Sequence, residues 1–158
     1  PLYPPLPPTL ILAASFCASG GGCGSGSLPR DNPGAAWQMP QGGIDKGEEP
    51  ETAALRELEE ETGVPAALVD IVAVTKDWIR YDLSPKIIPT LWGGKWRGQE
   101  QKYFLMRFLG TDGDVNIATA EPEFTAWKWL DPQELPEVIV PFKRKVYERV
   151  LAELGPLI

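Results

Sequence analysis

The residues with the clearest chemical potential are three glutamates, Glu57, Glu60 and Glu61, in a short acidic run. An α-helix turns by about 100° per residue, so these side chains fall within an arc of roughly 100°. Glu59 falls on the opposite side, where we expect it to be solvated. Like charges one turn apart repel each other, and a divalent cation turns that repulsion into attraction. Oxygen donors without nitrogen or sulfur favour Mg²⁺, or Mn²⁺ as a substitute, over Zn²⁺.

The alternative interpretation is a soluble helix with a charged face, which is common in globular proteins. The surrounding residues favour a site. Gly42 and Gly43, followed by Gly47, form a loop whose backbone can approach a ligand closely. Arg56 falls near Glu60 on the helix and can orient a carboxylate through a charge-assisted hydrogen bond.

The composition excludes several other chemistries. The 158-residue chain contains no histidine, so a Ser-His-Asp triad, a Cys-His dyad and a His-ligated zinc are all ruled out. Its two cysteines, Cys17 and Cys23, lack the spacing of a zinc or redox pair, and we interpret them as incidental thiols. No apolar run is long enough to span a membrane. The short apolar run at 10–16 has no positive charge before it and gives only weak support to a signal-peptide remnant.

The charge is unevenly distributed. The formal net charge is −7, and residues 45–61 alone carry −6. Residues 76–107 hold seven bases against three acids, and residues 143–149 hold four against one. An acidic patch with basic segments elsewhere suits a metal site flanked by cations that bind phosphate.

The elements that must position these residues read as one mixed α/β domain at 29–158. It follows an atypical Pro- and Gly-rich arm at 1–28, with at most one strand at 10–16. Helical spacing predicts a helix at 50–62, with Pro50 in its first turn and Gly63 just past its end. A second helix is expected at about 141–154, with an apolar stripe that starts at Phe142. Strands are predicted at 37–39, 69–75, 78–83, 102–109 and 126–130, with a long loop at roughly 84–100.

The segment 42–64 resembles the Nudix box, G-x5-E-x7-R-E-U-x-E-E-x-G-U, in which U is aliphatic. Every fixed position matches: Gly42, Glu48, Arg56, Glu57, Leu58, Glu60, Glu61, Gly63 and Val64. The segments WQMPQGGID (37–45), GQEQKYFL (98–105), PEFTAWKW (122–129) and VPFKRKVYERV (140–150) resemble the branch of RNA pyrophosphohydrolases and diadenosine-tetraphosphate hydrolases. The resemblance covers the chain from about Asp31 to the C-terminus.

This resemblance implies an α/β/α sandwich around a central mixed β-sheet, with the box as a loop–helix–loop. It also implies Mg²⁺-dependent hydrolysis of a phosphoanhydride. Carried over residue by residue, Glu57, Glu60 and Glu61 would be metal ligands and catalytic residues. Gly42, Glu48, Arg56 and Gly63 would be structural. Glu123 would be a further ligand or base, and Glu121 competes for that role.

The substrate-binding residues implied by the resemblance are Lys102, Val140, Phe142 and Lys143. The lysines would bind phosphates, for which Arg30, Arg97 and Arg144 are further candidates, and Val140 with Phe142 would hold the terminal base. Core packing is the rival role for Phe142, because it begins the apolar stripe. Trp78, Trp92 and Trp96 could line the cleft, but packing in the aromatic core is the default expectation for them.

The N-terminus departs from the family pattern. Members usually begin with Tyr-Arg-Pro and a Val-Gly-Val-type strand, whereas this chain has Tyr3-Pro4-Pro5 and a Gly-rich tract. A fragment, a processed form and a diverged start all fit that departure.

The leading functional hypothesis is removal of pyrophosphate from 5′-triphosphorylated RNA in the cytoplasm. The runner-up is asymmetric hydrolysis of dinucleoside polyphosphates, in which diadenosine tetraphosphate yields ATP and AMP. A catalytically silent Nudix module that only binds nucleotides or a protein is a third possibility, and the intact glutamates argue against it. A Ca²⁺-binding helix is the weakest, since no D-x-D-x-D-G loop is present. The oligomeric state is left open.

Overall fold

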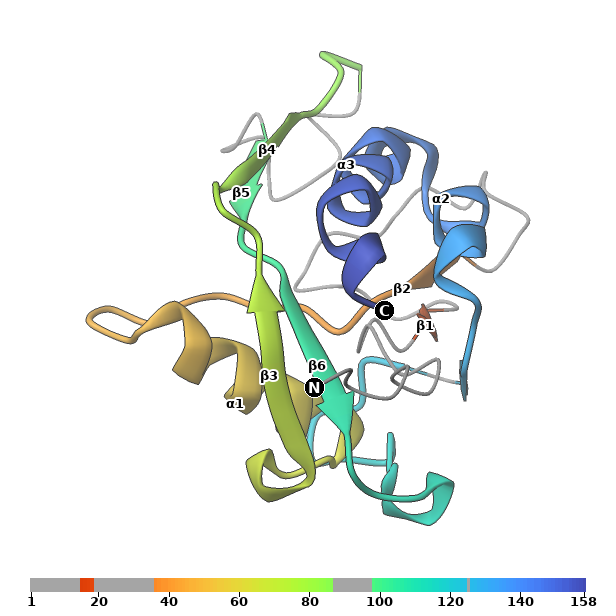
Figure 1. Cartoon of the computed structure of the whole chain (residues 1–158). Coiled ribbons are helices and arrows are strands. Elements are labelled where there is room, and N and C mark those ends of the chain that lie inside the picture. Colours follow the sequence, from red (N-terminus) through yellow and green to blue (C-terminus); the bar gives the residue numbers. More distant parts are fainter. Residues whose placement is uncertain (1–14, 19–35, 87–97, 125) are drawn as a thin grey trace, which may run out of the picture.

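The computed structural model describes residues 15–18, 36–86, 98–124 and 126–158 (Figure 1). Two antiparallel pairs of strands form its centre. Strand β3 (Val69–Val74) pairs with β6 (Phe104–Phe108), and β4 (Ile79–Asp82) pairs with β5 (Gly98–Gln101). A three-stranded sheet, in the order β2-β1-β7, contains β1 (Ser15–Ala18), β2 (Ala36–Gln38) and β7 (Ala126–Lys128). All the pairings between the described strands are antiparallel.

Helix α1 (Pro50–Thr62) has the predicted bounds, and its ends show why. Pro50 lacks the amide hydrogen that a first-turn residue would leave unpaired. At the other end, Gly63 adopts a left-handed conformation with φ of 70° and donates its N–H to the carbonyl oxygen of Glu59. The two ends of the acidic helix are therefore set by Pro50 and Gly63, and both residues can be recognised in the sequence.

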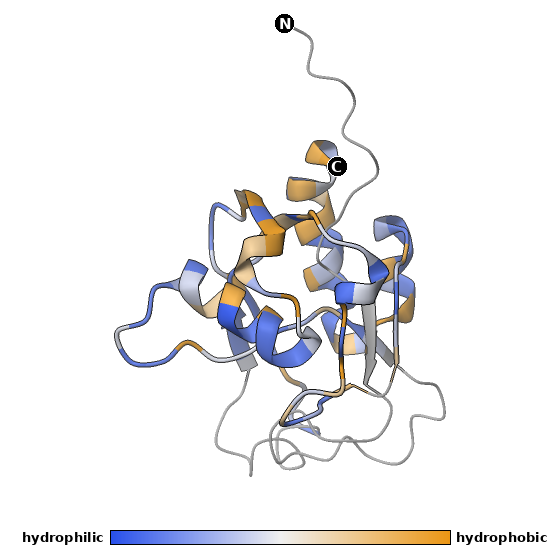
Figure 2. Cartoon of the chain, turned by 90° about the horizontal axis from the view of Figure 1, so that it is seen from below, coloured by the Kyte–Doolittle hydropathy of each residue, from blue (hydrophilic) through white to orange (hydrophobic). Residues whose placement is uncertain are grey.

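Helix α3 (Arg144–Leu154) provides the second amphipathic surface. Val146, Val150 and Leu154 are buried and Phe142 packs against the same cluster, which confirms the predicted stripe. Fully burying such a side chain contributes about 1.5–3 kcal/mol. The ribbon that ends at the C-terminus accordingly carries both hydrophobic and hydrophilic residues (Figure 2).

Two hydrophobic clusters lie on opposite faces of β6. Leu105 packs with Ile79, Tyr81 and the apolar side of α3, whereas Met106 packs with Leu58 of α1. Successive residues of a strand point to opposite faces, so one strand separates the two helices. This arrangement agrees with the predicted α/β/α layering.

The sequence analysis missed several elements. Strand β5 lies in the segment that was expected to be loop, because its sequence GQEQ has no apolar alternation. The short helix α2 (Leu135–Val138) was not predicted, and the first turn of the 141–154 helix is a 3₁₀ turn, η6 (Pro141–Lys143). The other short 3₁₀ turns are η1 (Ala66–Leu68), η4 (Asp112–Asp114), η5 (Pro132–Glu134) and η7 (Gly155–Leu157).

Strand β1 lies inside the segment expected to form an arm, and it pairs on one side with β2 and on the other with β7. The remainder of the strand predicted at 10–16 lies outside the described residues, as does most of the loop predicted at 84–100. No helix in the described part of the chain is both long and apolar enough to cross a bilayer.

Candidate active site

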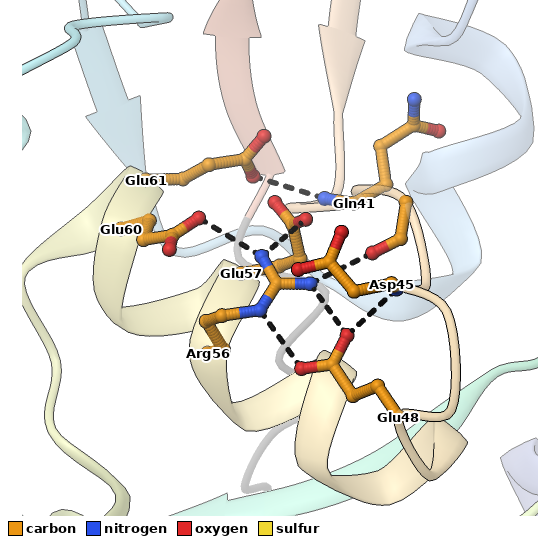
Figure 3. A network of polar contacts seen from close by, with 8 residues as sticks. Gln41, Asp45, Glu48, Arg56, Glu57, Glu60 and Glu61 are labelled. Atoms are coloured by element: carbon orange, nitrogen blue, oxygen red, sulfur yellow. Dashed lines mark hydrogen bonds and ion pairs between the residues drawn. The ribbon is translucent and has the colours of Figure 1, made fainter.

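Arg56 connects the glycine-rich loop to helix α1 (Figure 3). Its Nε and Nη2 atoms donate to the two carboxylate oxygens of Glu48 at 2.9 and 2.8 Å, and Nη2 also donates to the carbonyl oxygen of Gly43 at 2.8 Å. Nη1 donates to Glu57 at 2.7 Å and to Glu60 at 3.0 Å. A planar guanidinium satisfies this forked arrangement, which the single ammonium of lysine cannot reproduce. Arg56 therefore fixes the loop and orients two of the three glutamates.

The Glu48–Arg56 pair stays ionised. The hydrogen bond from Arg56, followed by one from the backbone N–H of Asp45, lowers the pKa of Glu48 to about 2. The same contact with Glu48, followed by the contact with Glu57, raises the pKa of Arg56 above its usual value. The link between loop and helix is thus charged on both sides at neutral pH.

The three glutamates have very different environments. The Glu60 side chain is 58% exposed and that of Glu57 is 18% exposed, whereas Glu61 as a residue is only 3% exposed. Glu61 Oε2 accepts a hydrogen bond from the backbone N–H of Gln41 at 2.9 Å. Burial, followed by a side-chain hydrogen bond with Glu123, raises the pKa of Glu61 to about 9. The protonated form of Glu61 is therefore favoured at neutral pH, where its side chain lies against that of Glu123.

The fourth acidic residue comes from a distant segment. Glu123 contacts Glu61 and lines the same cleft as Glu57, whereas Glu121 is exposed. Glu59 is exposed on the far side of α1, as the helical geometry predicts. No three acidic side chains among the described residues are gathered closely enough to enclose a metal position. Arg56 occupies the space between Glu57 and Glu60, and Glu61 is turned toward Gln41.

The side chain of Glu57 approaches the backbone of Gly42 so closely that only glycine fits at this position. A Cβ atom at this position would lie 1.7 Å from Cδ of Glu57, well inside van der Waals contact. By contrast, a Cβ atom at Gly43 would meet no atom within 4 Å. The first glycine of the box therefore makes room for the carboxylate of Glu57.

A cleft of about 640 Å³ adjoins the box. Glu57 and Glu123 line it, as do Trp78 and Lys102 from the segments that connect the central strands. The other lining residues that matter for the site are Gln41, Gly42, Gln99, Gln101 and Tyr103. The cleft places acidic, basic and aromatic groups around one space.

Two lysines from the predicted set lie at or behind this cleft. Lys102 Nζ donates to the carbonyl oxygen of Lys76 at 2.9 Å. Lys143 is only 5% exposed, and its Nζ donates to Oε1 of Gln41 at 2.7 Å and lies 5.6 Å from the ring centroid of Tyr81. Lys102 faces the cleft directly, whereas Lys143 reaches it through Gln41.

Val140 and Phe142 lie in a different place from the acidic residues. Both pack in the main core, and the ring of Phe142 lies 5.8 Å from that of Tyr81. Neither is among the described residues that line the cleft. Arg144 forms ion pairs with Glu137 and Glu148. Arg30, Arg97, Trp92 and Trp96 lie outside the described residues.

The sequence analysis missed a polar network in the wall of the cleft. Gln101 Nε2 donates to Gln41 at 3.0 Å and to Gln99 at 3.3 Å, while Gln101 Oε1 accepts from the Tyr103 hydroxyl at 2.6 Å. Tyr81 donates to Gln99 at 2.8 Å. Burial, followed by the neighbouring tyrosines, raises the pKa of Tyr103, so this hydroxyl stays a donor. The run of alternating glutamines at 99–101 was the available signal.

The fold and this acidic helix together define an α/β protein whose acidic site is built on a loop–helix–loop segment. A match to the NUDIX domain over residues 25–150 covers most of the sequence, so the chain belongs to the Nudix family. This result confirms the resemblance found in the box and the fold that it implies. The chain is a hydrolase that acts on phosphoanhydride bonds.

Several proteins with assigned names are similar to this chain in sequence or in fold. The RNA pyrophosphohydrolase of Roseobacter denitrificans is 62% identical over 77% of this chain and 76% of its own length. The enzyme of the same name from Cereibacter sphaeroides is 57% identical over 80% of this chain and 78% of its own length. A crystal structure of a C. elegans Ap4A hydrolase binary complex is similar in fold, with a TM-score of 0.53 and 21% identity over 90% of this chain and 86% of that one.

Proposed function

We propose that this chain is a metal-dependent pyrophosphohydrolase that removes pyrophosphate from the 5′ end of triphosphorylated RNA. One observation carries the proposal: the complete box places Glu57 in a cleft whose other residues include Lys102 and Trp78. The relatives named RNA pyrophosphohydrolase, at 57–62% identity, support the substrate class.

The donor set fits a hard divalent cation. Glu57, Glu60 and Glu61 offer only carboxylate oxygens, the ligands that Mg²⁺ and Mn²⁺ prefer. These three residues would hold the ion, which would activate water and neutralise phosphate charge. We propose Mg²⁺ as the physiological ion and Mn²⁺ as a substitute.

The remaining residues have distinct proposed roles. Glu123 would assist Glu61 as a further ligand or accept a proton from the attacking water. Lys102 and Lys143 would balance the negative charge of the phosphates, and Arg56 would keep Glu57 and Glu60 oriented. Contact of Val140 and Phe142 with the terminal base stays a prediction, since both residues pack in the core.

The test is a direct comparison of two substrates with Mg²⁺. We expect the purified chain to release pyrophosphate from 5′-triphosphorylated RNA and to lose this activity on Glu60→Gln substitution. Preferential cleavage of diadenosine tetraphosphate would contradict the RNA assignment and establish a dinucleotide hydrolase. Because RNA of this kind is made and turned over in the cytoplasm, we propose that the chain acts there.

A further inference from the structure

A short break separates the β3–β6 strand pair from the β4–β5 pair, and it falls at the same place on both sides. Strand β3 ends at Val74 and β4 begins at Ile79, while on the partner side β5 ends at Gln101 and β6 begins at Phe104. The break is held by two hydrogen bonds: Thr75 N–H donates to the Tyr103 carbonyl at 2.9 Å, and Tyr103 N–H donates to Thr75 Oγ1 at 3.1 Å. Figure 1 shows β4 and β5 continuing from β3 and β6 across this junction.

Trp78 lies in the segment between β3 and β4, and its side chain lines the cleft. Its neighbour Ile79 is almost fully buried, whereas Trp78 is 44% exposed and lines the cleft. Packing in the core was the default expectation for this tryptophan, and the structure places it at the cleft instead. An indole is one of the largest apolar surfaces a protein can expose, and flat rings of this kind are the usual platforms for nucleic-acid bases.

Lys102 lies beside this ring. Its Nζ atom is 6.0 Å from the Trp78 ring centroid and is anchored by the carbonyl oxygen of Lys76. An ammonium has three donors, so this bond leaves two for another acceptor. The pair thus presents a stacking surface and a positive charge next to each other, which are the two features that a nucleotide unit needs.

We propose that Trp78 is the stacking platform for one unpaired base of the RNA, with Lys102 binding a phosphate of the same strand. The inference rests on the proposed function and deepens it, because it assigns a subsite that recognises the nucleic-acid part of the substrate. Trp78 does not act on the phosphoanhydride. It contributes to affinity for the RNA and therefore to KM.

A second exposed tryptophan in the described part of the chain provides a matched control. Trp129 is 39% exposed, but its Nε1 donates to Asp112 at 2.7 Å and its ring packs against Phe108 and Trp127. It is not among the described residues that line the cleft. A general effect of removing an exposed indole would appear in both tryptophan variants, and a specific effect only at Trp78.

The experiment measures binding without turnover. In the Glu60→Gln background with Mg²⁺, fluorescence anisotropy gives the Kd of 3′-labelled, 5′-triphosphorylated tetranucleotides, either complete or abasic at one position. We expect Trp78→Ala to raise the Kd for the complete RNA by roughly 5- to 100-fold, the range for loss of one stacked base. Trp78→Phe should recover much of the affinity, and Trp129→Ala should keep it.

The abasic series identifies the stacked base. At one position, removal of the base should weaken binding to the parent chain but have no further effect in Trp78→Ala, because the two changes remove the same contact. Strictly additive effects at every position, an unchanged Kd in Trp78→Ala, or no RNA binding by the parent chain would each overturn the inference. Hydrolysis by the wild-type chain is assayed separately, so failure of the proposed activity is distinguished from failure of this subsite.

Discussion

The box at 42–64 and the cleft wall formed by Trp78 and Lys102 are built in opposite ways. Every contact of Arg56 with Glu48, Glu57, Glu60 and Gly43 joins residues within 13 positions of each other. Trp78 and Lys102 come from two chain segments, one between β3 and β4 and one between β5 and β6, which are joined by bonds such as that from Lys102 Nζ to the Lys76 carbonyl across 26 positions. One region follows from helix geometry, and the other exists only after the strands have paired. The chemistry is therefore encoded locally, and substrate recognition depends on the assembled fold.

The largest expected effect lies within the box. Glu60→Gln should lower turnover by about 10²- to 10⁴-fold, because it removes a proposed ligand or proton acceptor while keeping the side-chain volume. Steady-state kinetics on triphosphorylated RNA measures this, with Glu59→Gln as the control on the far side of the same helix. Equal losses in both variants would show that helix charge, and not the position of Glu60, controls the rate.

A smaller but still large effect is expected at the first glycine. Gly42→Ala should lower turnover by roughly 100-fold, because the new methyl group displaces the carboxylate of Glu57 and catalytic groups tolerate little misplacement. Gly43→Ala has open space around the methyl group and should keep near-wild-type turnover. If the two variants have the same rate, the close approach of Gly42 to Glu57 has no catalytic role.

The forked contacts of Arg56 should matter less than the glutamates that it orients. Arg56→Lys keeps the positive charge but loses the bidentate geometry to Glu48, so we expect a roughly 10- to 100-fold fall in turnover. Circular dichroism should show an intact helix content. Full activity in this variant would mean that charge alone positions the glutamates.

The smallest effect is expected at the end of the helix and concerns stability. Gly63→Ala should lower the free energy of unfolding by about 1–2 kcal/mol, since φ is 70° there, and more if the contact with Asn116 does not relax. Gly47→Ala carries a similar backbone strain, with φ of 83°, but meets no atom within 4 Å. Urea unfolding of both variants separates strain from steric contact, and equal losses would assign the whole effect to the backbone.

The elements with strong local signals could be predicted. Helix α1 has the bounds given by Pro50 and Gly63, and the stripe of α3 is buried as its four-residue spacing requires. Strand β5 could not be predicted, because its polar residues belong to a glutamine and tyrosine network that forms only across strands.

The sequence by itself determined the family, the acidic helix and the arc shared by Glu57, Glu60 and Glu61, because a regular helix converts spacing directly into position. Only the tertiary structure decided that Glu61 is buried against Glu123 while Glu60 stays in solvent. It also decided that Phe142 packs in the core and Trp78 faces the cleft. Burial depends on which distant segments cover a side chain, and no local pattern contains that information.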